Sequence, residues 1–363
     1  MPTLSNASEV VLVTGANGFV ATWTIGNLLK RGYTVRAAVR DESRGIHLLQ
    51  TYQSHGDRLY LFEVGDMQKD GAFDTAVQGV DAVIHTAAQV NLLATDPKGM
   101  VVVYLIYSKV IPDKSTDIID PAVKGVTGIL NSAIKHGSQL KRVVFTSTCL
   151  TIHDFSMDDV TVSEADWNEK AVRECEEKGA EAHPLSMYSA SKTLAEKAAW
   201  ALYEENRSQV SWDLTVINLP WVVGPTIHEV STPDTLNEST KHWYRAIVEG
   251  DFGGGPSLML PNYGWADVRD VSEALVRALE VKEAAGERIV ICAGSPFVWQ
   301  DWLNVANSLT PTPYHKIAKG TPGTAHRGIK FDISKERRIL GLQFRTMEEV
   351  TRDVLADYTR RGW

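Results

Sequence analysis

The sequence predicts an α/β fold with a doubly wound parallel sheet. Short apolar segments rich in β-branched residues alternate with longer segments in which apolar residues recur every three or four positions. The apolar segments lack the polar alternate positions of a half-exposed strand, which indicates a sheet covered by helices on both faces. The chain of 363 residues is long enough for such a domain and a smaller lobe.

The elements follow one another in the order that this fold requires. The first strand spans residues 10–14 and is followed by a helix from Gly18, with Gly32 as its C-cap. The charged run 169–181 is typical of a solvated surface helix. Further strands are expected at 33–39, 59–64, 81–86, 142–146 and 214–219, and further helices at 121–135 and 186–205.

After Pro220 the alternation loosens, and prolines and the glycine-rich stretch 253–256 mark loops. We therefore divide the chain into a sheet domain over 1–220 and a smaller lobe over 221–363, with segments that return to the sheet domain. In this lobe, helices are expected at 239–249, 271–279, 300–308 and 346–360, and a β-prone run at 288–292.

Composition argues against several classes of protein. The formal net charge of −8 disfavours nucleic acid as a partner. The three cysteines, Cys149, Cys175 and Cys292, show neither a disulfide framework nor metal-ligand spacing. The longest apolar run, 100–106, is too short to cross a bilayer, and no secretory signal is visible at the N-terminus. A cytoplasmic protein without a membrane span is expected.

A glycine-rich turn lies between the first strand and the first helix. It reads TGANGFVA over residues 14–21. Gly15 and Gly18 permit a tight turn and a close approach of the backbone to a pyrophosphate, which would rest on the helix N-terminus. Such turns also occur for packing alone, but the place between a strand and a helix favours a nucleotide. Residues 1–220 are therefore predicted to form an NAD(P)-binding Rossmann domain, and 221–363 mainly a substrate-binding lobe.

The end of the second strand distinguishes the two nicotinamide cofactors. An acidic residue there would bind the ribose 2′-hydroxyl of NAD, whereas an arginine would pair with the 2′-phosphate of NADP. The sequence places Arg40 before Asp41, with Arg44 beyond. Arg40 could also be a solvated residue that closes the strand, and Asp41 leaves NAD(H) open. The order of these residues favours NADP(H) over NAD(H).

A tyrosine and a lysine lie four residues apart on the long helix, Tyr188 and Lys192 in the sequence YSASK. This spacing puts both side chains on one face. An ammonium held close lowers the pKa of a phenol and makes it a usable acid and base. The alternative is a packed tyrosine beside an exposed lysine. After a nucleotide motif and five strands of a parallel sheet, the pair indicates catalysis.

Several motifs together make the sequence resemble the extended short-chain dehydrogenase/reductases. The similar branch contains the dihydroflavonol-reductase-like enzymes and fungal NADPH-dependent aldehyde and ketone reductases. The motifs are VTGANGFVA (13–21), YTVRAAVRD (33–41), VGDM (64–67), VIHTAA (83–88), FTST (145–148), YSASK (188–192), LPWVVGP (219–225) and DVRDV (267–271).

The resemblance implies a role for each matching residue. Tyr188 would protonate the substrate oxygen as hydride arrives, and Lys192 would also bind the nicotinamide ribose. Residues 66–67 would lie by the adenine, 86–88 along the pyrophosphate and ribose, and 220 and 223 beside the nicotinamide. The implied cofactor-binding set is Gly15, Asn17, Gly18, Phe19, Val20, Arg40, Asp66, Met67, Thr86, Ala87, Ala88, Tyr188, Lys192, Pro220 and Val223.

Some of these positions have a simpler explanation. Asp66 could be a turn residue, residues 86–88 the end of a buried strand, and Pro220 a strand terminator. His85 is interpreted as a packed residue rather than a ligand or a base.

The sequence departs from the family pattern in two places. Thr148 stands where the family has its catalytic serine; it keeps the hydroxyl, while its methyl group narrows the pocket. Ser147 is a poor substitute, because adjacent strand residues point to opposite faces. The stretch 89–120 is longer than usual, with an apolar centre within 99–112. It is interpreted as a lid, as a flap that contacts a membrane or partner, or as a retained intron.

These observations predict an NADPH-dependent oxidoreductase that reversibly reduces an aldehyde or ketone to an alcohol, with Tyr188, Lys192 and Thr148 as its catalytic residues. The alternatives are a nucleotide-sugar epimerase or dehydratase of the same fold, and a non-catalytic dinucleotide-binding module. A small carbonyl or alcohol substrate in secondary metabolism and a monomer or homodimer are expected. Aromatic residues that could line the substrate pocket or belong to the core are Trp221, Trp243, Tyr244, Phe252, Tyr263 and Trp265.

Overall fold

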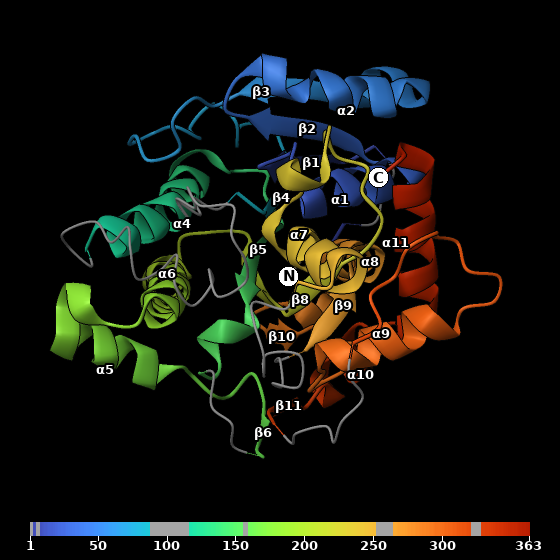
Figure 1. The fold of residues 1–363 in the computed structure, drawn as a ribbon. Helices are drawn as coiled ribbons and strands as arrows, with labels where there is room; N and C mark the ends of the chain where they lie inside the picture. The colour runs from blue at the N-terminus through green and yellow to red at the C-terminus, as the bar shows by residue number, and fades with distance from the viewer. Residues whose placement is uncertain (1–2, 5–7, 88–115, 155–158, 252–263, 321–327) are drawn as a thin grey trace.

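The computed structural model describes residues 3–4, 8–87, 116–154, 159–251, 264–320 and 328–363 (Figure 1). Its central sheet has seven strands in the order β10-β7-β5-β4-β1-β2-β3, all paired in parallel. The predicted fold class is confirmed. The strands are β1 (Val10–Thr14), β2 (Thr34–Val39), β3 (Leu59–Glu63), β4 (Ala82–His85), β5 (Arg142–Thr148), β7 (Asp213–Leu219) and β10 (Arg288–Val290).

Helices cover both faces of the sheet, which is why its strands carry apolar residues on both faces. On β1, Val11 and Val13 pack into the core with α1 (Phe19–Lys30) and α8 (Val268–Glu280). Leu12, between them, packs into the opposite core with α4 (Thr116–His136) and α6 (Pro184–Asn206). Successive strand residues thus supply two separate cores.

A third core lies outside the central sheet and is built largely from aromatic residues. Trp243 and Trp302 are both completely buried there, with ring centroids 5.9 Å apart. The core is formed by α7 (Glu238–Tyr244), the π-helical turn Arg245–Glu249, α9 (Trp299–Ser308), α11 (Met347–Arg361) and the strand pair β8 (Trp221–Val223) and β9 (Trp265–Asp267).

The remaining elements are short or peripheral. The charged run forms α5 (Glu169–Lys178) and a 3-10 turn over Gly179–Glu181, as expected for a surface helix. The sequence patterns did not predict α2 (Ile46–Thr51), α10 (Ser334–Ile339), or the strand pair β6 (Thr161–Val162) and β11 (Lys330–Phe331).

The predicted element bounds differ from the observed ones in a few places. Helix α4 begins at Thr116 and includes Pro121, which was expected to start it. Helix α1 is capped at Arg31, and Gly32 follows with φ +95°. The long segment before α4 lies largely outside the described residues, as does Ala88. The domain boundary at 220 stays a prediction.

Among the described helices, none is long and apolar enough to cross a membrane.

Candidate active site

Several of the predicted site residues follow strands at one edge of the central sheet. Because all seven strands are parallel, their carboxyl ends share that edge. Gly15 follows β1, Arg40 follows β2, and Thr148 ends β5. The chain runs from β1 outward through β2 and β3, and on the other side through β4, β5, β7 and β10. The carboxyl edge beside β1 is therefore the switch point at which such sheets bind nucleotides.

Gly15 occupies a position that only glycine fits. Its φ is +62°, in the left-handed region. A Cβ at this position would lie 2.9 Å from the Cα of Ala87, in the segment after β4. The backbone N–H of Gly18 then donates to the carbonyl of Gly15 at 2.9 Å, which closes the turn.

The N-terminus of α1 is open to an anion. Gly18 is its N-cap and supplies no side-chain acceptor, and the first turn holds no acidic residue. The N–H groups at the start of a helix lack intrahelical partners and carry partial positive charge. Phe19 and Val20 lie in this turn, and Asn17 is exposed just before it. A phosphate fits this site.

Arg40 offers a free cation close to the same edge. It is exposed, and no hydrogen bond or ion pair joins it to another residue in the described parts of the chain. Asp41 is already engaged, because its carboxylate accepts the backbone N–H of Ser43 at 2.9 Å and caps the 3-10 turn Glu42–Gly45. Hydrogen bonds from Ser43 also lower the pKa of Asp41.

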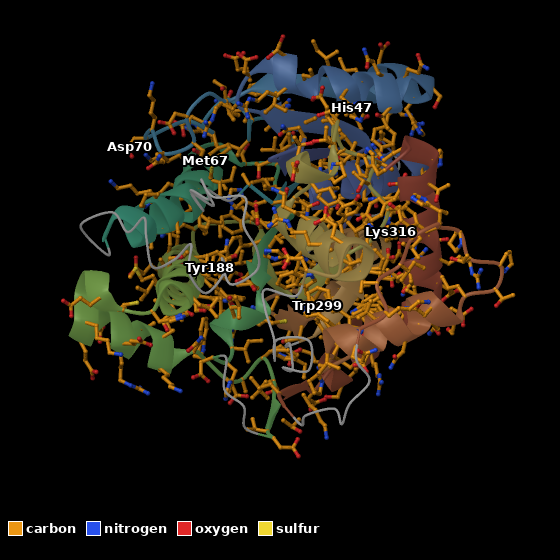
Figure 2. All side chains as sticks on the ribbon, in the orientation of Figure 1. His47, Met67, Asp70, Tyr188, Trp299 and Lys316 are labelled. Atoms are coloured by element: carbon orange, nitrogen blue, oxygen red, sulfur yellow. The ribbon has the colours of Figure 1, made fainter. Side chains whose placement is uncertain are left out.

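The loop after β3 is held by local contacts. Asp66 accepts the backbone N–H of Gln68 at 3.1 Å, which is the turn role that the sequence left open. Met67 packs partly against the core around α4. Figure 2 shows Met67 above α4 and Tyr188 on α6.

Side chains also join the ends of β1 and β4. The Thr14 hydroxyl lies 2.9 Å from Nδ1 of His85 and accepts the backbone N–H of Ala87 at 3.2 Å. The Thr86 hydroxyl donates to the carbonyl of Thr14. Burial lowers the pKa of His85 to about 3, so its ring is neutral, as expected of a packed residue.

Tyr188 and Lys192 lie one turn apart on α6, and both are half-buried. Burial lowers the pKa of Lys192 to about 8, although the negative charge of Glu196 acts to raise it. Burial raises the pKa of Tyr188 to about 12. The expectation of a lowered tyrosine pKa is therefore wrong for this structure, because desolvation of the phenolate outweighs any attraction to the lysine.

Thr148 and Ser147 point to different surroundings, as alternation along a strand requires. Thr148 is half-buried at the end of β5. Ser147 is buried, and its hydroxyl donates to the carboxylate of Glu196 at 2.6 Å. Of the two hydroxyls, only that of Thr148 is free of this buried network.

The residues after β7 differ in their access to a ligand. Pro220 is half-buried, whereas Val223 is completely buried in the aromatic core and has no surface to offer a nicotinamide ring. Trp221 is half-buried and stacks on His242, with ring centroids 5.4 Å apart. Trp243, Tyr244 and Trp265 are core residues, and Phe252 and Tyr263 lie outside the described residues.

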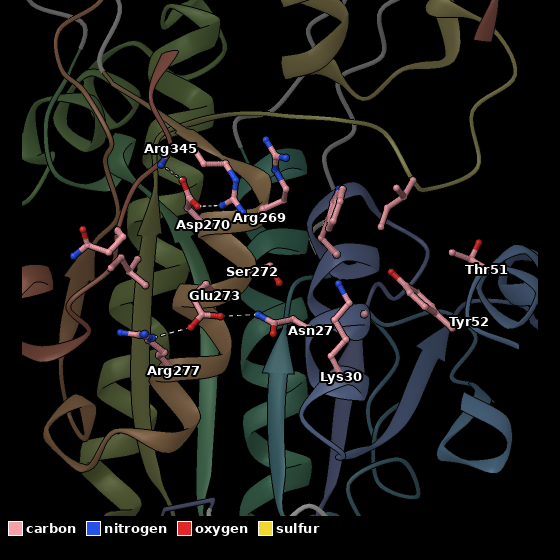
Figure 3. Close-up of a pocket in the computed structure, with 15 residues that line it drawn as sticks. Asn27, Lys30, Thr51, Tyr52, Arg269, Asp270, Ser272, Glu273, Arg277 and Arg345 are labelled. Atoms are coloured by element: carbon pink, nitrogen blue, oxygen red, sulfur yellow. Dashed lines mark hydrogen bonds and ion pairs between the residues drawn. The ribbon is translucent and has the colours of Figure 1, made fainter. Parts of the chain in front are cut away.

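A separate cavity of about 550 Å³ lies between α1 and α8 (Figure 3). None of the predicted site residues is among those that line it. Its arginines are already paired with carboxylates, as in the contact of 2.8 Å between Arg277 and Glu273. Arg345 pairs with Asp270 in the same way. The arginines of the cavity therefore present little free charge to a ligand, and Lys30 is the lining cation without an ion pair in the described part of the chain.

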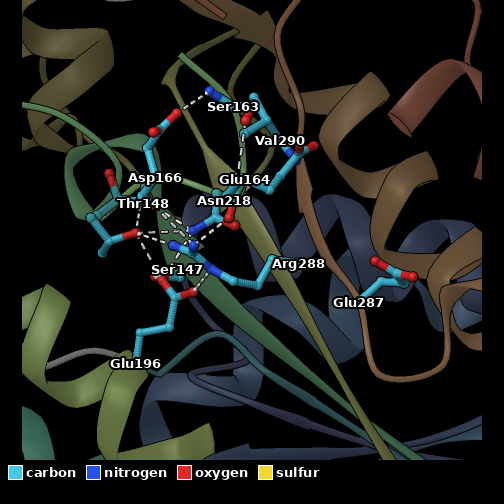
Figure 4. A network of polar contacts seen from close by, with 12 residues as sticks. Ser147, Thr148, Ser163, Glu164, Asp166, Glu196, Asn218, Glu287, Arg288 and Val290 are labelled. Atoms are coloured by element: carbon cyan, nitrogen blue, oxygen red, sulfur yellow. Dashed lines mark hydrogen bonds and ion pairs between the residues drawn. The ribbon is translucent and has the colours of Figure 1, made fainter. Parts of the chain in front are cut away.

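The sequence patterns missed a cluster of buried polar side chains around Glu196. Glu196 lies behind Thr148 and contacts Asn218 of β7 and Arg288 of β10 (Figure 4). Asn218 and Arg288 are distant in sequence, and both reach Glu196 because β7 and β10 are neighbours in the sheet. The position of Glu196 four residues after Lys192, on the same helix face, was the signal that could have found it.

Comparison with known proteins agrees with this architecture. A doubly wound sheet with a glycine turn at its switch point is typical of dinucleotide-binding proteins. The profile of the NAD dependent epimerase/dehydratase family matches residues 11–292, and the chain belongs to this family. The resemblance to the extended short-chain dehydrogenase/reductases is thereby confirmed.

Several similar proteins are reductases of nearly equal length. The ketoreductase azaE of Aspergillus niger is 32% identical, over 97% of this chain and 98% of its own. The NADPH-dependent methylglyoxal reductase GRE2 of Saccharomyces cerevisiae is 30% identical, over 94% of this chain and 96% of its own. The crystal structure of yeast methylglyoxal/isovaleraldehyde reductase Gre2 complexed with NADPH superimposes with a TM-score of 0.80, at 29% identity, and covers 97% of this chain and 99% of that one.

Proposed function

We propose that the protein is an NADPH-dependent reductase that converts an aldehyde or a ketone to an alcohol, reversibly. The observation that carries this proposal is the arrangement of Tyr188 and Lys192 one turn apart on α6, with the half-buried Thr148 at the carboxyl edge of the sheet. The similarity to the azaE ketoreductase and the GRE2 reductase supports the same reaction class.

The glycine turn and the charge of Arg40 support NADPH as the cofactor. The open N-terminus of α1 and the turn around Gly15 would hold the pyrophosphate. Arg40 would pair with the 2′-phosphate, since its guanidinium has no partner among the described residues and Asp41 is engaged with Ser43. The further proposed contacts are Asn17, Gly18, Phe19, Val20, Asp66, Met67, Thr86, Ala87, Pro220 and Lys192, and Val223 is left out because it is fully buried.

When bound, NADPH would supply a hydride to the carbonyl carbon of the substrate. The neutral phenol of Tyr188 donates its proton to the carbonyl oxygen, and burial keeps this proton in place at neutral pH. The hydroxyl of Thr148 donates a hydrogen bond to the same oxygen as negative charge develops there. The ammonium of Lys192 stabilises the phenolate that Tyr188 becomes and binds ribose hydroxyls.

We also propose that the protein acts in the cytoplasm on a small carbonyl compound of secondary metabolism, as a monomer or a homodimer. The three scattered cysteines, which are free thiols, support the compartment.

The test is the initial rate of NADPH oxidation, with NADH as comparator, over a panel of aliphatic and aromatic aldehydes and ketones. We expect NADPH-dependent turnover in the wild type and its loss in Tyr188→Phe, which removes the proton donor. NADPH binding, followed by its fluorescence, should persist in this variant. Binding without turnover on any carbonyl in the wild type would favour a dinucleotide-binding module, and tightly retained NAD in the purified protein an epimerase.

A further inference from the structure

The buried carboxylate of Glu196 lies close to the end of β5, beside the residues that flank Thr148. It takes no part in the proposed proton transfer. Glu196 is 0% exposed and lies one turn beyond Lys192 on α6. Its Oε2 accepts from the Ser147 hydroxyl at 2.6 Å and the Asn218 amide at 3.0 Å. Its Oε1 accepts from Nε of Arg288 at 2.6 Å. One helical side chain thus connects three neighbouring strands, β5, β7 and β10 (Figure 4).

The same contacts hold the backbone of Thr148 from both sides. Ser147 precedes it in β5, and Thr151 follows it in the 3-10 turn Cys149–Thr151. The Thr151 hydroxyl oxygen lies 2.8 Å from the Thr148 carbonyl oxygen and 2.8 Å from Oε2 of Glu196. The Asn218 amide also reaches the Thr148 carbonyl, at 3.4 Å.

Arg288 fixes the far side of the carboxylate. Its guanidinium lies 3.6 Å from the ring centroid of Trp167 and donates to the carbonyl of Asp166 at 3.1 Å. A buried ion pair contributes little net stability, because desolvation of both charges offsets their attraction. A network whose donors are all satisfied does hold one geometry, which a site for chemistry needs.

We propose that Glu196 is a positioning residue, which fixes the end of β5 so that the Thr148 hydroxyl meets the substrate oxygen. The inference rests on the proposed reductase function and assigns Glu196 no contact with substrate or cofactor. Burial favours the loss of the Lys192 proton, and the negative charge of Glu196 acts in the opposite direction.

The first test replaces the carboxylate by an amide. In Glu196→Gln, one of the two positions becomes an N–H donor, so Arg288 or the three donors on the other side lose their acceptor. We expect kcat to fall about 10- to 100-fold, as a displacement near the reacting atoms does, with the KM for NADPH within about twofold of wild type.

Asp213→Asn is the matched control for this variant. Asp213 forms a buried ion pair with Arg142, which joins β7 and β5 at the opposite edge of the sheet, with Nη2 and Oδ2 3.1 Å apart. This substitution replaces the charged partner of the buried Arg142 by a neutral amide, so we expect a lower free energy of unfolding. The kcat of the folded protein should stay within about twofold of wild type, because the carboxyl edge is untouched.

Thr151 provides a milder test if Glu196→Gln does not fold. Thr151→Val removes the hydroxyl at nearly constant volume and should lower kcat about tenfold. Thr151→Ser restores the hydroxyl and should restore kcat, a rescue that a general loss of stability would not give. The control is Thr215→Val in the middle of β7, which loses a buried hydrogen bond of 2.7 Å to the Ala284 carbonyl and should keep wild-type kcat.

Equal kcat values in Glu196→Gln, Thr151→Val and the two controls would overturn the inference while leaving the reductase function intact. The same holds if Thr151→Ser remains as slow as Thr151→Val. A wild-type protein without turnover on the carbonyl panel overturns the proposed function, and this inference with it.

Discussion

The hydroxyl oxygen of Thr148 accepts a hydrogen bond from the backbone N–H of Leu150, at 3.3 Å. This contact caps the 3-10 turn that follows β5 and uses a lone pair of the oxygen. The single hydroxyl proton therefore stays available for a donor role. A serine can make the same two contacts, so we expect Thr148 to take the role that the resemblance assigns to the family's serine.

We expect Thr148→Ser to retain reductase activity and Thr148→Ala to lose most of it. Loss of one donor to a developing oxyanion lowers kcat about 100-fold or more. The measurement is kcat on the best carbonyl substrate at saturating NADPH, with thermal unfolding to show that both variants are folded. Equal activity in wild type and Thr148→Ala would remove Thr148 from the mechanism.

Carbonyl reduction should lose rate as the pH rises through about 8, the pKa to which burial lowers Lys192. Below this pH the ammonium is charged, and above it the charge that stabilises the Tyr188 phenolate disappears. Tyr188 keeps its own proton, since its pKa is raised to about 12, and His85, with a pKa of about 3, is neutral throughout. A profile of kcat/KM against pH should fall about tenfold per unit on the basic side.

Lys192→Arg provides the control for this profile, because a guanidinium stays charged over the whole range. The kcat/KM that this variant retains should not fall as the pH rises through about 8. A wild-type profile that stays flat to about pH 10 would contradict the assignment of the limb to Lys192.

Arg40→Ala should weaken the use of NADPH and leave that of NADH nearly unchanged. A hydrogen bond between charged groups contributes about 1.5–3 kcal/mol, so we expect kcat/KM for NADPH to fall at least about tenfold. Arg173→Ala, at an exposed position on α5, is the control and should alter neither value. An equal loss with both cofactors would show that Arg40 does not recognise the 2′-phosphate.

The sequence patterns predicted the features that depend on residues close together in the chain. The strand of residues 10–14 and the helix around Tyr188 have strong local signals, and the structure places both within two residues of their predicted bounds. The pair β6 and β11 has no such signal, because two-residue strands meet across a long separation. Glu196 on its helix resembles a solvated acid until β7 and β10 bring Asn218 and Arg288 to it. The pKa of Tyr188 likewise depends on burial that only tertiary structure reveals.

Gly15→Ala should lower both stability and NADPH affinity, since the new Cβ meets the backbone of Ala87 at 2.9 Å. Gly79→Ala is the matched control: Gly79 has φ +69° against +62° for Gly15, but nothing lies within 4 Å of its Cβ position. The control should lose only the backbone cost of a left-handed residue, about 1–2 kcal/mol in the free energy of unfolding. Gly15→Ala should lose about 1–3 kcal/mol more, since the turn must shift, and urea unfolding of both variants measures the difference. Equal losses, with NADPH affinity unchanged in both, would mean that the close approach at Gly15 shapes neither the fold nor the phosphate site.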